Sequence, residues 1–600
     1  MGKLIKFLFV LTILCYSNMG RATTPTTYDC TLNDEISVAE CETLVSIYQS
    51  TQGEMWHNSE NLLWLKNSQP CSWEGITCWG SKVSLLELPN FGLRGTLPHL
   101  GGLAHLVQLG LFDNPELTGP IPDLTALPKL AIVIIFKTAI TGLLPDTANM
   151  PKLNELVLHS NNLSGPIPDM SHLEELVLHG NDLCLANSID YQDVADQVDG
   201  YTTCESVHET LFNGYLDVTE IGAVPDDGKP DNNSINHALN MLQLSLPAGE
   251  KLRNLTVFFP SGVYHLDKSI QLVNFDTVAF IGRKANDAPS VLLKTALFGN
   301  GTNRLVYDSR QASILDFRYG QNLKVEFLSL KGQTTSLHES HIWWENGIYI
   351  GSSHNTHISE NKFYDFGDSA LTISTDPDDT TGQIDSTNHL VSNNYFHNIT
   401  QTSTTSAKGG SSHYSFVGNT VEHIKGSIKF ATRRAGASHL KITNNTITSA
   451  GVGSGIPTNN GFEIEGYSKI YVSNNTLASG DGVGIVIRSA QDKNTESGHD
   501  WGDVFISGNH ISKYRQGIYV SNLPHASDGL LGSLKNIFIN DNQIVNMWNG
   551  DNQAGIHLVG KQFSYAYIHH NSIIGGRHTY WAGESQDPSW LSARDNTITQ

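Results

Sequence analysis

A short β-rich motif that contains one asparagine recurs through the second half of the chain, and it restricts the folds that this chain can adopt. Copies such as "SFVGNTV" and "YVSNNTL" place one asparagine in each unit. The repeated asparagines are Asn361, Asn394, Asn419, Asn445, Asn475, Asn509, Asn542, Asn571 and Asn596. Units of 25 to 34 residues are too small to fold alone, so they must stack on one another. We therefore predict a parallel β-helix in which stacked asparagine amides satisfy one another inside a turn.

A different repeat occupies the first part of the chain. The segment "LNELVLHSNNLSGPIPD" fits the pattern L-x-x-L-x-L-x-x-N-x-L, and a glycine recurs at positions 95, 119, 142 and 165. This pattern predicts a leucine-rich repeat solenoid. It resembles the plant-type subfamily, and "MWHNSENLLWLKNSQPCSWEGITC" resembles that family's disulfide-bearing amino-terminal cap. The resemblance covers roughly residues 30 to 205 and implies a module that binds a protein or glycan partner.

The start of the second part also carries a resemblance. The segments "DVTEIGAVPDDGKPDNNSINHALNML" and "VFFPSGVYHLDKSIQL" resemble the entry of the pectate-lyase-like superfamily. That superfamily includes polysaccharide lyases, polygalacturonase-type hydrolases, epimerases and phage tailspikes. The predicted fold class is therefore an all-β solenoid, a right-handed parallel β-helix, with an amino-terminal leucine-rich repeat α/β solenoid. We expect a signal peptide over 1–22, the leucine-rich repeat domain over 23–205 and the β-helix over 206–600.

The beginning of the chain and its cysteines predict export. "MGKLIKFLFVLTILCYSNMGRA" has a basic start, an apolar run and a small-residue end near Ala22, as in a cleavable secretory signal. No later apolar run is long enough to span a bilayer. The six cysteines that follow favour three disulfides in sequence order. The expected pairs are Cys30 with Cys41, Cys71 with Cys78, and Cys184 with Cys204.

The charge of the chain limits its partners. A formal net charge of -22 argues against nonspecific nucleic-acid binding, which requires many cations. An anionic ligand must therefore find a local basic patch. The segment "GSIKFATRR" supplies one, because Lys429, Arg433 and Arg434 lie together on one short strand.

Strands of pattern Gly-Φ-x-Φ follow several of the repeated asparagines. Alternate side chains of a strand face opposite ways, so stacking the coils creates outward columns about 4.8 Å apart. The first predicted column reads Tyr349, Thr372, Lys408, Lys429, Glu463, Val486, Tyr519 and His557. The second reads Gly351, Ser374, Gly410, Ala431, Glu465, Arg488, Ser521 and Val559. We predict that these columns form one exposed face.

This face suggests β-elimination on an acidic, uronic-acid-containing polysaccharide. A lysine that repels a neighbouring lysine can act as a general base, and an arginine can neutralise the substrate carboxylate. Lys408 or Lys429 is the predicted base, and Arg433, Arg434 or Arg488 is the predicted neutraliser. The pattern resembles alginate- and chondroitin-cleaving β-helix lyases, in which Lys408 matches the base. That family's arginine falls at Ala431, and the acidic calcium ligands before the base are absent here.

Other functions fit the same residues. Glu463 and Glu465 lie about 6.5 Å apart along one strand face, which approaches the carboxyl separation of an inverting glycosidase. C5-epimerisation begins with the same proton abstraction as elimination. A noncatalytic adhesin would use both solenoids as binding faces, and cross-strand ion pairs on a solvated surface would also explain the charges.

Further residues are candidates for contact with ligands. The predicted substrate-binding residues are Tyr349, Thr372, Trp343, Trp344, Tyr519 and His557, which are aromatic or lie in the first column. The segment "STDPDDTTGQID" clusters oxygen ligands that suit calcium, although it lacks a defined loop spacing. Its carboxylates are Asp376, Asp378, Asp379 and Asp385. No other cofactor is predicted.

Overall fold

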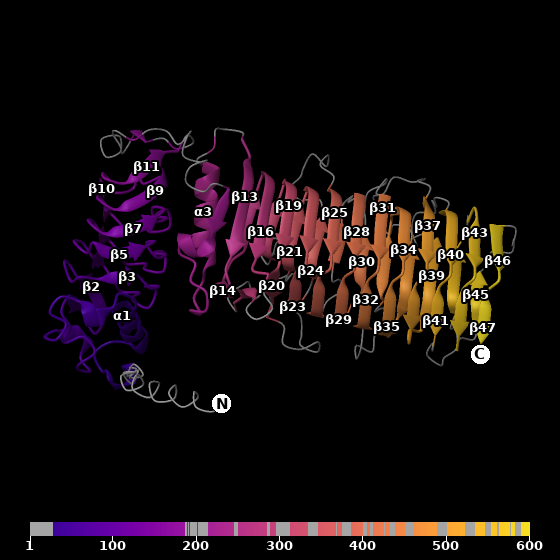
Figure 1. Ribbon diagram of the computed structural model, residues 1–600, viewed down its shortest axis with the longest axis horizontal. Helices are drawn as coiled ribbons and strands as arrows, with labels where there is room; N and C mark the ends of the chain where they lie inside the picture. Colours follow the sequence, from indigo (N-terminus) through magenta and orange to yellow (C-terminus); the bar gives the residue numbers. More distant parts are fainter. Residues whose placement is uncertain are drawn as a thin grey trace, which may run out of the picture.

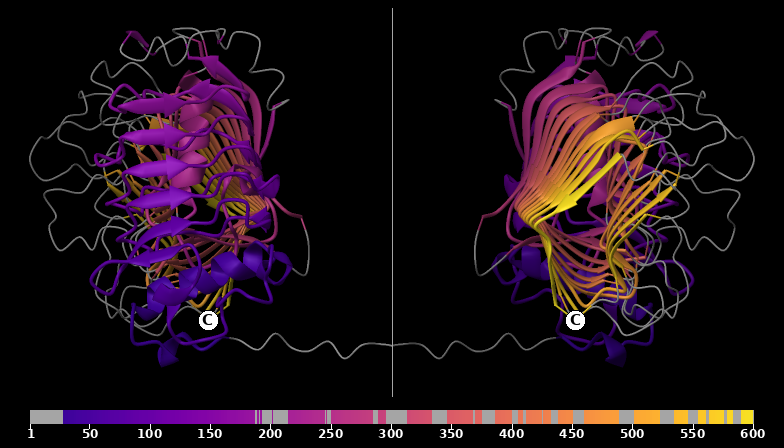
Figure 2. Two further views of the ribbon diagram at one scale, coloured as in Figure 1. Left: turned by 90° about the vertical axis from the view of Figure 1, so that its left-hand side faces the viewer. Right: turned by 90° about the vertical axis from the view of Figure 1, so that its right-hand side faces the viewer.

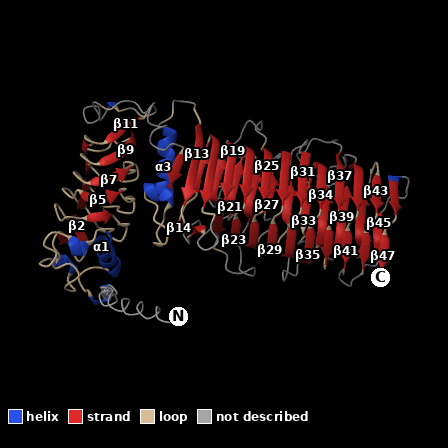
Figure 3. Cartoon of the chain, viewed as in Figure 1, coloured by secondary structure: helices blue, strands red, loops and turns tan. Residues whose placement is uncertain are grey.

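Two solenoids make up the structure, which is a computed structural model (Figure 1). The leucine-rich repeat solenoid runs across the axis of the β-helix, and helix α3 (Asn232–Leu244) lies between them. Strands dominate both solenoids (Figure 3). The structure describes residues 28–186, 189, 191–192, 201, 214–244, 246, 250–284, 289–295, 313–333, 346–367, 369–374, 386–399, 405–408, 412–424, 426–431, 438–450, 460–488, 501–522, 534–545, 554–560, 563–575, 578–582 and 590–599.

The leucine-rich repeat solenoid has two sheets that the chain visits in turn. The first contains β1 (Ile76–Cys78), β2 (Val83–Glu87), β4 (Gln108–Gly110), β6 (Ile132–Ile134), β8 (Glu155–Val157) and β10 (Glu175–Val177). The second contains β3 (Arg94–Thr96), β5 (Glu116–Gly119), β7 (Ala139–Gly142), β9 (Asn162–Ile167) and β11 (Asp182–Leu185). The repeat leucines fill the core because the strands place Leu156 and Leu176 in register, facing inward and buried. The predicted leucine-rich repeat is confirmed.

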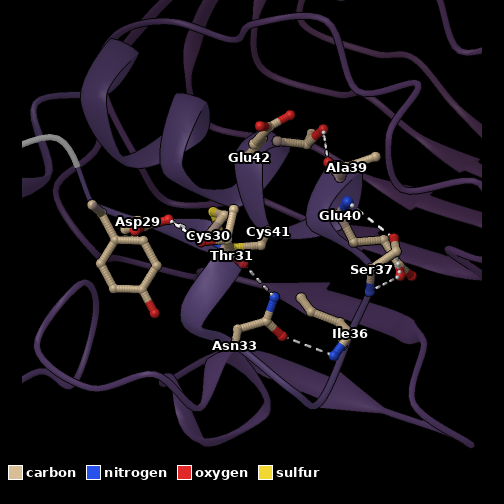
Figure 4. The surroundings of a disulfide bond; sticks show 12 residues. Asp29, Cys30, Thr31, Asn33, Ile36, Ser37, Ala39, Glu40, Cys41 and Glu42 are labelled. Carbon is tan, nitrogen blue, oxygen red and sulfur yellow. Dashed lines mark hydrogen bonds between the residues drawn. A yellow bond between two sulfur atoms is a disulfide. The ribbon is translucent and has the colours of Figure 1, made fainter.

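The amino-terminal cap is built around α1 (Val38–Ser50) and the short 3-10 helices Cys30–Leu32, Gly53–Met55 and Pro70–Ser72. Ser37 starts α1 with a capping box, because its hydroxyl accepts from the Glu40 N–H while the Glu40 carboxylate accepts from the Ser37 N–H (Figure 4). The Cys30–Cys41 disulfide ties α1 to the first 3-10 helix. That bridge confirms the first predicted pair.

The other predicted disulfides lie at both ends of the same domain. The Cys71–Cys78 bond is present, which confirms the second pair. Cys184 is disulfide-bonded, while its predicted partner Cys204 and the predicted signal peptide over 1–22 lie outside the described residues.

The β-helix has three faces. The long face contains β12 (Tyr215–Asp217), β13 (Leu252–Phe259), β16 (Phe275–Gly282), β19 (Gln321–Glu326), β22 (His354–Ser359), β25 (Thr387–Ser392), β28 (Ser412–Val417), β31 (Ser438–Thr443), β34 (Ser468–Ser473), β37 (Trp501–Ser507), β40 (Leu534–Asn540), β43 (Ala566–His569) and β46 (Leu591–Arg594). The second face contains β14 (Gly262–Leu266), β17 (Ser290–Lys294), β20 (Leu328–Lys331), β23 (Lys362–Phe366), β26 (Tyr395–Ile399), β29 (Thr420–Ile424), β32 (Thr446–Ala450), β35 (Thr476–Gly480), β38 (His510–Ser512), β41 (Gln543–Val545), β44 (Ser572–Ile574) and β47 (Thr597–Thr599). Figure 2 shows these stacked coils end on.

The third face, called here the split face, consists of two sheets. One contains β15 (Ile270–Val273), β18 (Ser313–Arg318), β21 (Asn346–Gly351), β24 (Ser369–Ser374) and β27 (Thr405–Lys408). The other contains β30 (Ile428–Ala431), β33 (Phe462–Glu465), β36 (Val483–Arg488), β39 (Gln516–Asn522), β42 (Ala554–Gly560) and β45 (His578–Ala582). Among these described strands, β27 and β30 are neighbours that belong to different hydrogen-bonded sheets.

The repeated asparagines form a buried ladder at the turn between the long face and the second face. From Asn394 onward, the side-chain oxygen at each rung accepts from the side-chain amide and the backbone N–H of the preceding asparagine, whereas Asn361 at the first rung accepts from the Leu328 N–H. Asn445, for example, accepts both bonds from Asn419 and donates to Asn475. Each side chain also donates to a strand carbonyl, as Asn445 does to Phe416. The ladder confirms the stacking that the sequence predicts, and it gives the described turns from Asn361 to Asn596 satisfied polar groups.

Candidate functional site

Four charged side chains meet on the split face. Strand pairing places Lys429 of β30 opposite Glu463 of β33, and Glu465 of β33 opposite Arg488 of β36. The apolar residues between them point into the core, so alternation sends these four side chains outward. The predicted register of both columns from β30 to β42 is confirmed.

Each cation contacts both carboxyl groups. The Lys429 Nζ lies 3.4 Å from Glu463 Oε1 and 3.2 Å from Glu465 Oε2. The Arg488 Nη1 lies 3.4 Å from Glu463 Oε1 and 3.8 Å from Glu465 Oε1. The carboxyl side chains are only 12% and 9% exposed, against 31% for Lys429 and 34% for Arg488. These four residues, the charge cluster, therefore present their cations toward solvent and shelter their carboxyls.

The pKa values of the two carboxyls move in opposite directions. Burial acts to raise the pKa of Glu463, but the charges of Lys429 and Arg488 and the Asn460 hydrogen bond outweigh it and lower that pKa. Burial raises the pKa of Glu465, the Lys429 charge and hydrogen bond oppose this shift, and the Glu463 carboxylate with its hydrogen bond reinforces it, so that the pKa remains raised. Of the two carboxyls, Glu465 is therefore the one that keeps its proton to the higher pH.

One neighbour of this pair, Asn460, carried no recognised sequence signal. The Asn460 amide donates to Glu463 Oε2 at 3.1 Å, and its oxygen accepts from the Val483 N–H at 3.0 Å. The Asn460 N–H donates to the Ser427 hydroxyl, so this buried residue connects three successive coils. Asn460 therefore orients Glu463.

A second ion pair lies on the split face, several coils earlier. Asp316 and Arg318 of β18 form two hydrogen bonds of 3.1 and 3.0 Å, and Asp316 is fully buried. Asp316 is in register with Tyr349 and Arg318 with Gly351, so the pair continues the two columns. The alternation in "ILDFRYG" is the signal that could have revealed it.

The predicted position of Lys408 is wrong by two residues. Ser406 pairs with Thr372, and Lys408 pairs with Ser374, so Lys408 does not continue the Thr372 column. The reason is that Ala407, which is the apolar residue of β27, takes the core register opposite Ile373. The side chain of Lys408 lies outside the described residues.

The predicted exposure of the first column is wrong at several positions. Tyr349 is 2% exposed, Thr372 8% and His557 7%, and Val486 is fully buried. Packing within the face contributes, because the Thr372 hydroxyl donates to Asn346 and the His557 ring packs edge-on against Tyr519. These side chains are buried in the free protein, whereas Tyr519 is half-buried.

Other predicted residues cannot be placed. Arg433, Arg434, Trp343 and Trp344 lie outside the described residues, as do the proposed calcium ligands Asp376, Asp378, Asp379 and Asp385. Within the described ranges, no group of three or more His, Cys, Asp or Glu side chains is arranged to hold a metal ion. The same ranges contain no helix that is long and apolar enough to cross a membrane.

Comparisons with known proteins agree with the two-solenoid architecture. A family model described as a right-handed beta helix region matches residues 327–498. The chain is 37% identical over 75 residues to pollen receptor-like kinase 1 of Arabidopsis thaliana, which is 12% of this chain and 11% of the relative. It is 42% identical over 64 residues to the probable inactive receptor kinase RLK902 of the same plant, 10% of each protein. The chain thus spans about a tenth of the length of these curated relatives.

Solved structures resemble each part separately. An exopolygalacturonase from Thermotoga maritima aligns with a TM-score of 0.41 and 9% identity over 64% of this chain and 91% of its own. PfbA, a surface adhesin of Streptococcus pneumoniae, aligns with a TM-score of 0.37 and 16% identity over the same shares. The leucine-rich repeat ectodomain of the Arabidopsis receptor kinase SOBIR1 aligns with a TM-score of 0.21 and 22% identity over 25% of this chain and 83% of its own.

Proposed function

We propose that this protein cleaves a glycosidic bond in an acidic polysaccharide, with Glu465 as proton donor and Glu463 as the ionised partner. One observation carries the proposal: two adjacent carboxyls on one outward strand have pKa values driven apart by their surroundings. Such a division of roles is what acid and base catalysis on a single substrate requires.

The chemistry follows from the two protonation states. Glu465 gives its proton to the glycosidic oxygen as the bond from that oxygen to the anomeric carbon breaks. The Glu463 carboxylate accepts a proton from a water molecule, whose oxygen adds to the anomeric carbon. The two carboxyls share a hydrogen bond in the free protein, so they lie closer than the expected separation of about 6.5 Å and closer than the roughly 6.5–9.5 Å of an inverting glycosidase. The mechanism therefore requires the bound substrate to part them, which breaks this hydrogen bond. The overall reaction is hydrolysis, and Asn460 keeps Glu463 oriented toward the water.

The charge of the cluster supports an acidic substrate. The charge cluster contains two cations and two carboxyls, and it carries one net positive charge in the state in which Glu465 holds its proton. Its cations are also its more exposed members. A guanidinium such as that of Arg488 suits the planar carboxylate of a uronic acid. The cluster thus offers an anion site on a protein that is otherwise acidic.

β-Elimination is the second candidate, because a lysine and an arginine flank the reacting pair. It would require Lys429 to act as the base, whereas its Nζ is held at ion-pair distance from both carboxyls, 3.4 Å from Glu463 and 3.2 Å from Glu465. Lys408, Arg433 and Arg434 are still proposed contributors to this reaction. We rank hydrolysis first because it uses Glu465 as the acid and Glu463 as the base, the roles that the opposite shifts of their pKa values favour.

We further propose that the protein works outside the cell. The two complete disulfides and the disulfide-bonded Cys184 support an oxidising compartment. Plant-type leucine-rich repeat modules imply a protein or glycan partner for the first solenoid.

The test is to incubate the purified protein with polygalacturonate, alginate and glycosaminoglycans. New reducing ends without ultraviolet absorbance indicate hydrolysis, and absorbance from unsaturated uronates indicates elimination. The substitution Glu465→Gln keeps the shape of the side chain but removes its transferable proton, so we expect activity to fall by about 10² to 10⁴-fold.

A matched control variant tests whether loss of any carboxylate from the β-helix lowers activity. Glu326→Gln removes a carboxylate that pairs with Lys324 at 2.9 Å on the long face, away from the charge cluster. This variant should keep full activity. Binding without any product would contradict the proposal and favour a noncatalytic adhesin, and equal activity of Glu465→Gln and the unaltered protein would exclude Glu465 as the acid.

A further inference from the structure

The two solenoids meet at a seam that is fixed by hydrogen bonds. The Asn233 amide of α3 donates to Asp123 Oδ2 of the leucine-rich repeat domain at 2.8 Å. The His237 Nε2 of the same helix lies 2.7 Å from the Leu144 carbonyl oxygen. Leu143 packs against the core of the β-helix at the same seam. The walls on either side of the seam are therefore held in place before any ligand arrives.

A groove of about 520 Å³ lies along this seam. One wall consists of leucine-rich repeat turns that contain prolines and Asp146, and the other consists of α3 and Lys268. Small-molecule sites have volumes of about 300–1,000 Å³ and occur preferentially where domains meet. α3 lies between the two solenoids in Figure 1, whereas β30 of the charge cluster lies in the middle of the β-helix. The groove is thus distinct from the charge cluster.

Several polar groups at this groove retain bonding capacity for a ligand. Asp146 accepts the Ala148 N–H with Oδ1, which leaves Oδ2 as an acceptor. A neutral His237 that donates from Nε2 to the Leu144 carbonyl presents Nδ1 as a second acceptor. Asn240 lies exposed on α3, where its amide both donates and accepts. A ligand that carries many hydroxyl groups uses donors and acceptors mixed in this way.

The charge of the lining selects among such ligands. Its charged side chains are Asp123, Asp146 and Lys268, which sum to one net negative charge when His237 is neutral. A uronate would be repelled, whereas a neutral sugar would not. The proline rings supply apolar surface against which the C–H faces of a sugar can pack.

We propose that the seam groove binds a neutral oligosaccharide, and that it does so independently of the charge cluster. The site would hold the protein on a neutral glycan, while the split face meets an acidic one. Because both walls are needed, neither solenoid alone would bind. The negative lining of the groove distinguishes it from the charge cluster, in which the two cations are the more exposed side chains.

The experiment is isothermal titration of the full chain with a panel of neutral hexasaccharides, namely cello-, xylo- and mannohexaose, and with hexagalacturonate. We expect at least one neutral ligand to bind and hexagalacturonate not to bind at the groove. Asn240→Ala removes one hydrogen-bonding amide at a helical position that tolerates alanine, so the affinity should fall about tenfold. Asn240→Trp fills the groove and should abolish binding.

Two control variants test whether a loss of affinity is specific to residues of the groove. Asn154→Ala alters an exposed asparagine on the leucine-rich repeat domain outside the groove, and it should bind as the unaltered protein does. Glu465→Gln should also bind normally, so a failure of the proposed catalysis would not affect this test. The proposal is overturned if no neutral ligand binds, if both Asn240 variants bind normally, or if hexagalacturonate occupies the groove.

Discussion

Removing one amide from the asparagine ladder should weaken the β-helix at a defined place. The Asn445 side chain is almost fully buried and takes part in four hydrogen bonds, two accepted from Asn419 and one donated to each of Phe416 and Asn475. A typical hydrogen bond contributes about 1 kcal/mol net, so Asn445→Ala should cost about 4 kcal/mol of local stability.

The assay is native-state hydrogen exchange at the backbone N–H of Asn419. That N–H donates to Asn445 Oδ1 at 2.8 Å, and it is left without this acceptor in the variant. A loss of about 4 kcal/mol corresponds to roughly a thousandfold faster exchange through local opening. Peptides from the leucine-rich repeat domain should exchange as before.

The matched control is Asn444→Ala, one residue earlier. Asn444 is exposed and has a φ of 57°, a left-handed conformation that asparagine adopts more easily than alanine. Asn444→Ala should therefore lower the stability by only about 1 kcal/mol. If Asn445→Ala exchanged no faster than Asn444→Ala, the ladder would not hold the coils together as we infer.

Two further predictions concern the charge cluster. The pKa of Glu465 is raised in the folded protein. The protonated Glu465 carboxyl therefore stabilises the fold below the pKa that it has in the unfolded chain, and this contribution is lost as the pH rises through its folded-state pKa. Glu465→Gln should therefore gain melting temperature relative to the unaltered protein as the pH rises above about 4, the ordinary value for glutamate, and a difference that does not change with pH would contradict the assignment. Asn460→Ala removes a donor from Glu463 and should raise its pKa, which moves the acid limb of the activity profile to higher pH; a uniform loss at every pH would show a purely structural role.

Most of the architecture could be predicted because the sequence motifs that determine it repeat at short intervals along the chain. The asparagine in each coil and the alternation of Ile428, Phe430 and their stacked counterparts fix both the fold and the outward direction of Lys429 and Glu463. Neighbouring rungs lie one strand spacing apart, so residues 34 positions apart in sequence become direct contacts. The charge cluster followed from that geometry alone.

The features that were not predicted depend on contacts with residues outside the strand in question, or on a strand whose own residues fix its register only weakly. Lys408 was misplaced because "TSAK" offers only Ala407 to fix its register. The burial of Tyr349 and His557 depends on what packs over the face, which alternation does not encode. Asn460 gains its role from Val483, a partner in the following coil.

A crystal structure of the Glu465→Gln variant, with an oligouronate of the cleaved polymer bound, tests the central claim most directly. We predict a glycosidic oxygen within hydrogen-bonding distance of residue 465 and a sugar carboxylate beside Arg488. An oligouronate bound on another face, with the charge cluster untouched, would contradict the proposed site.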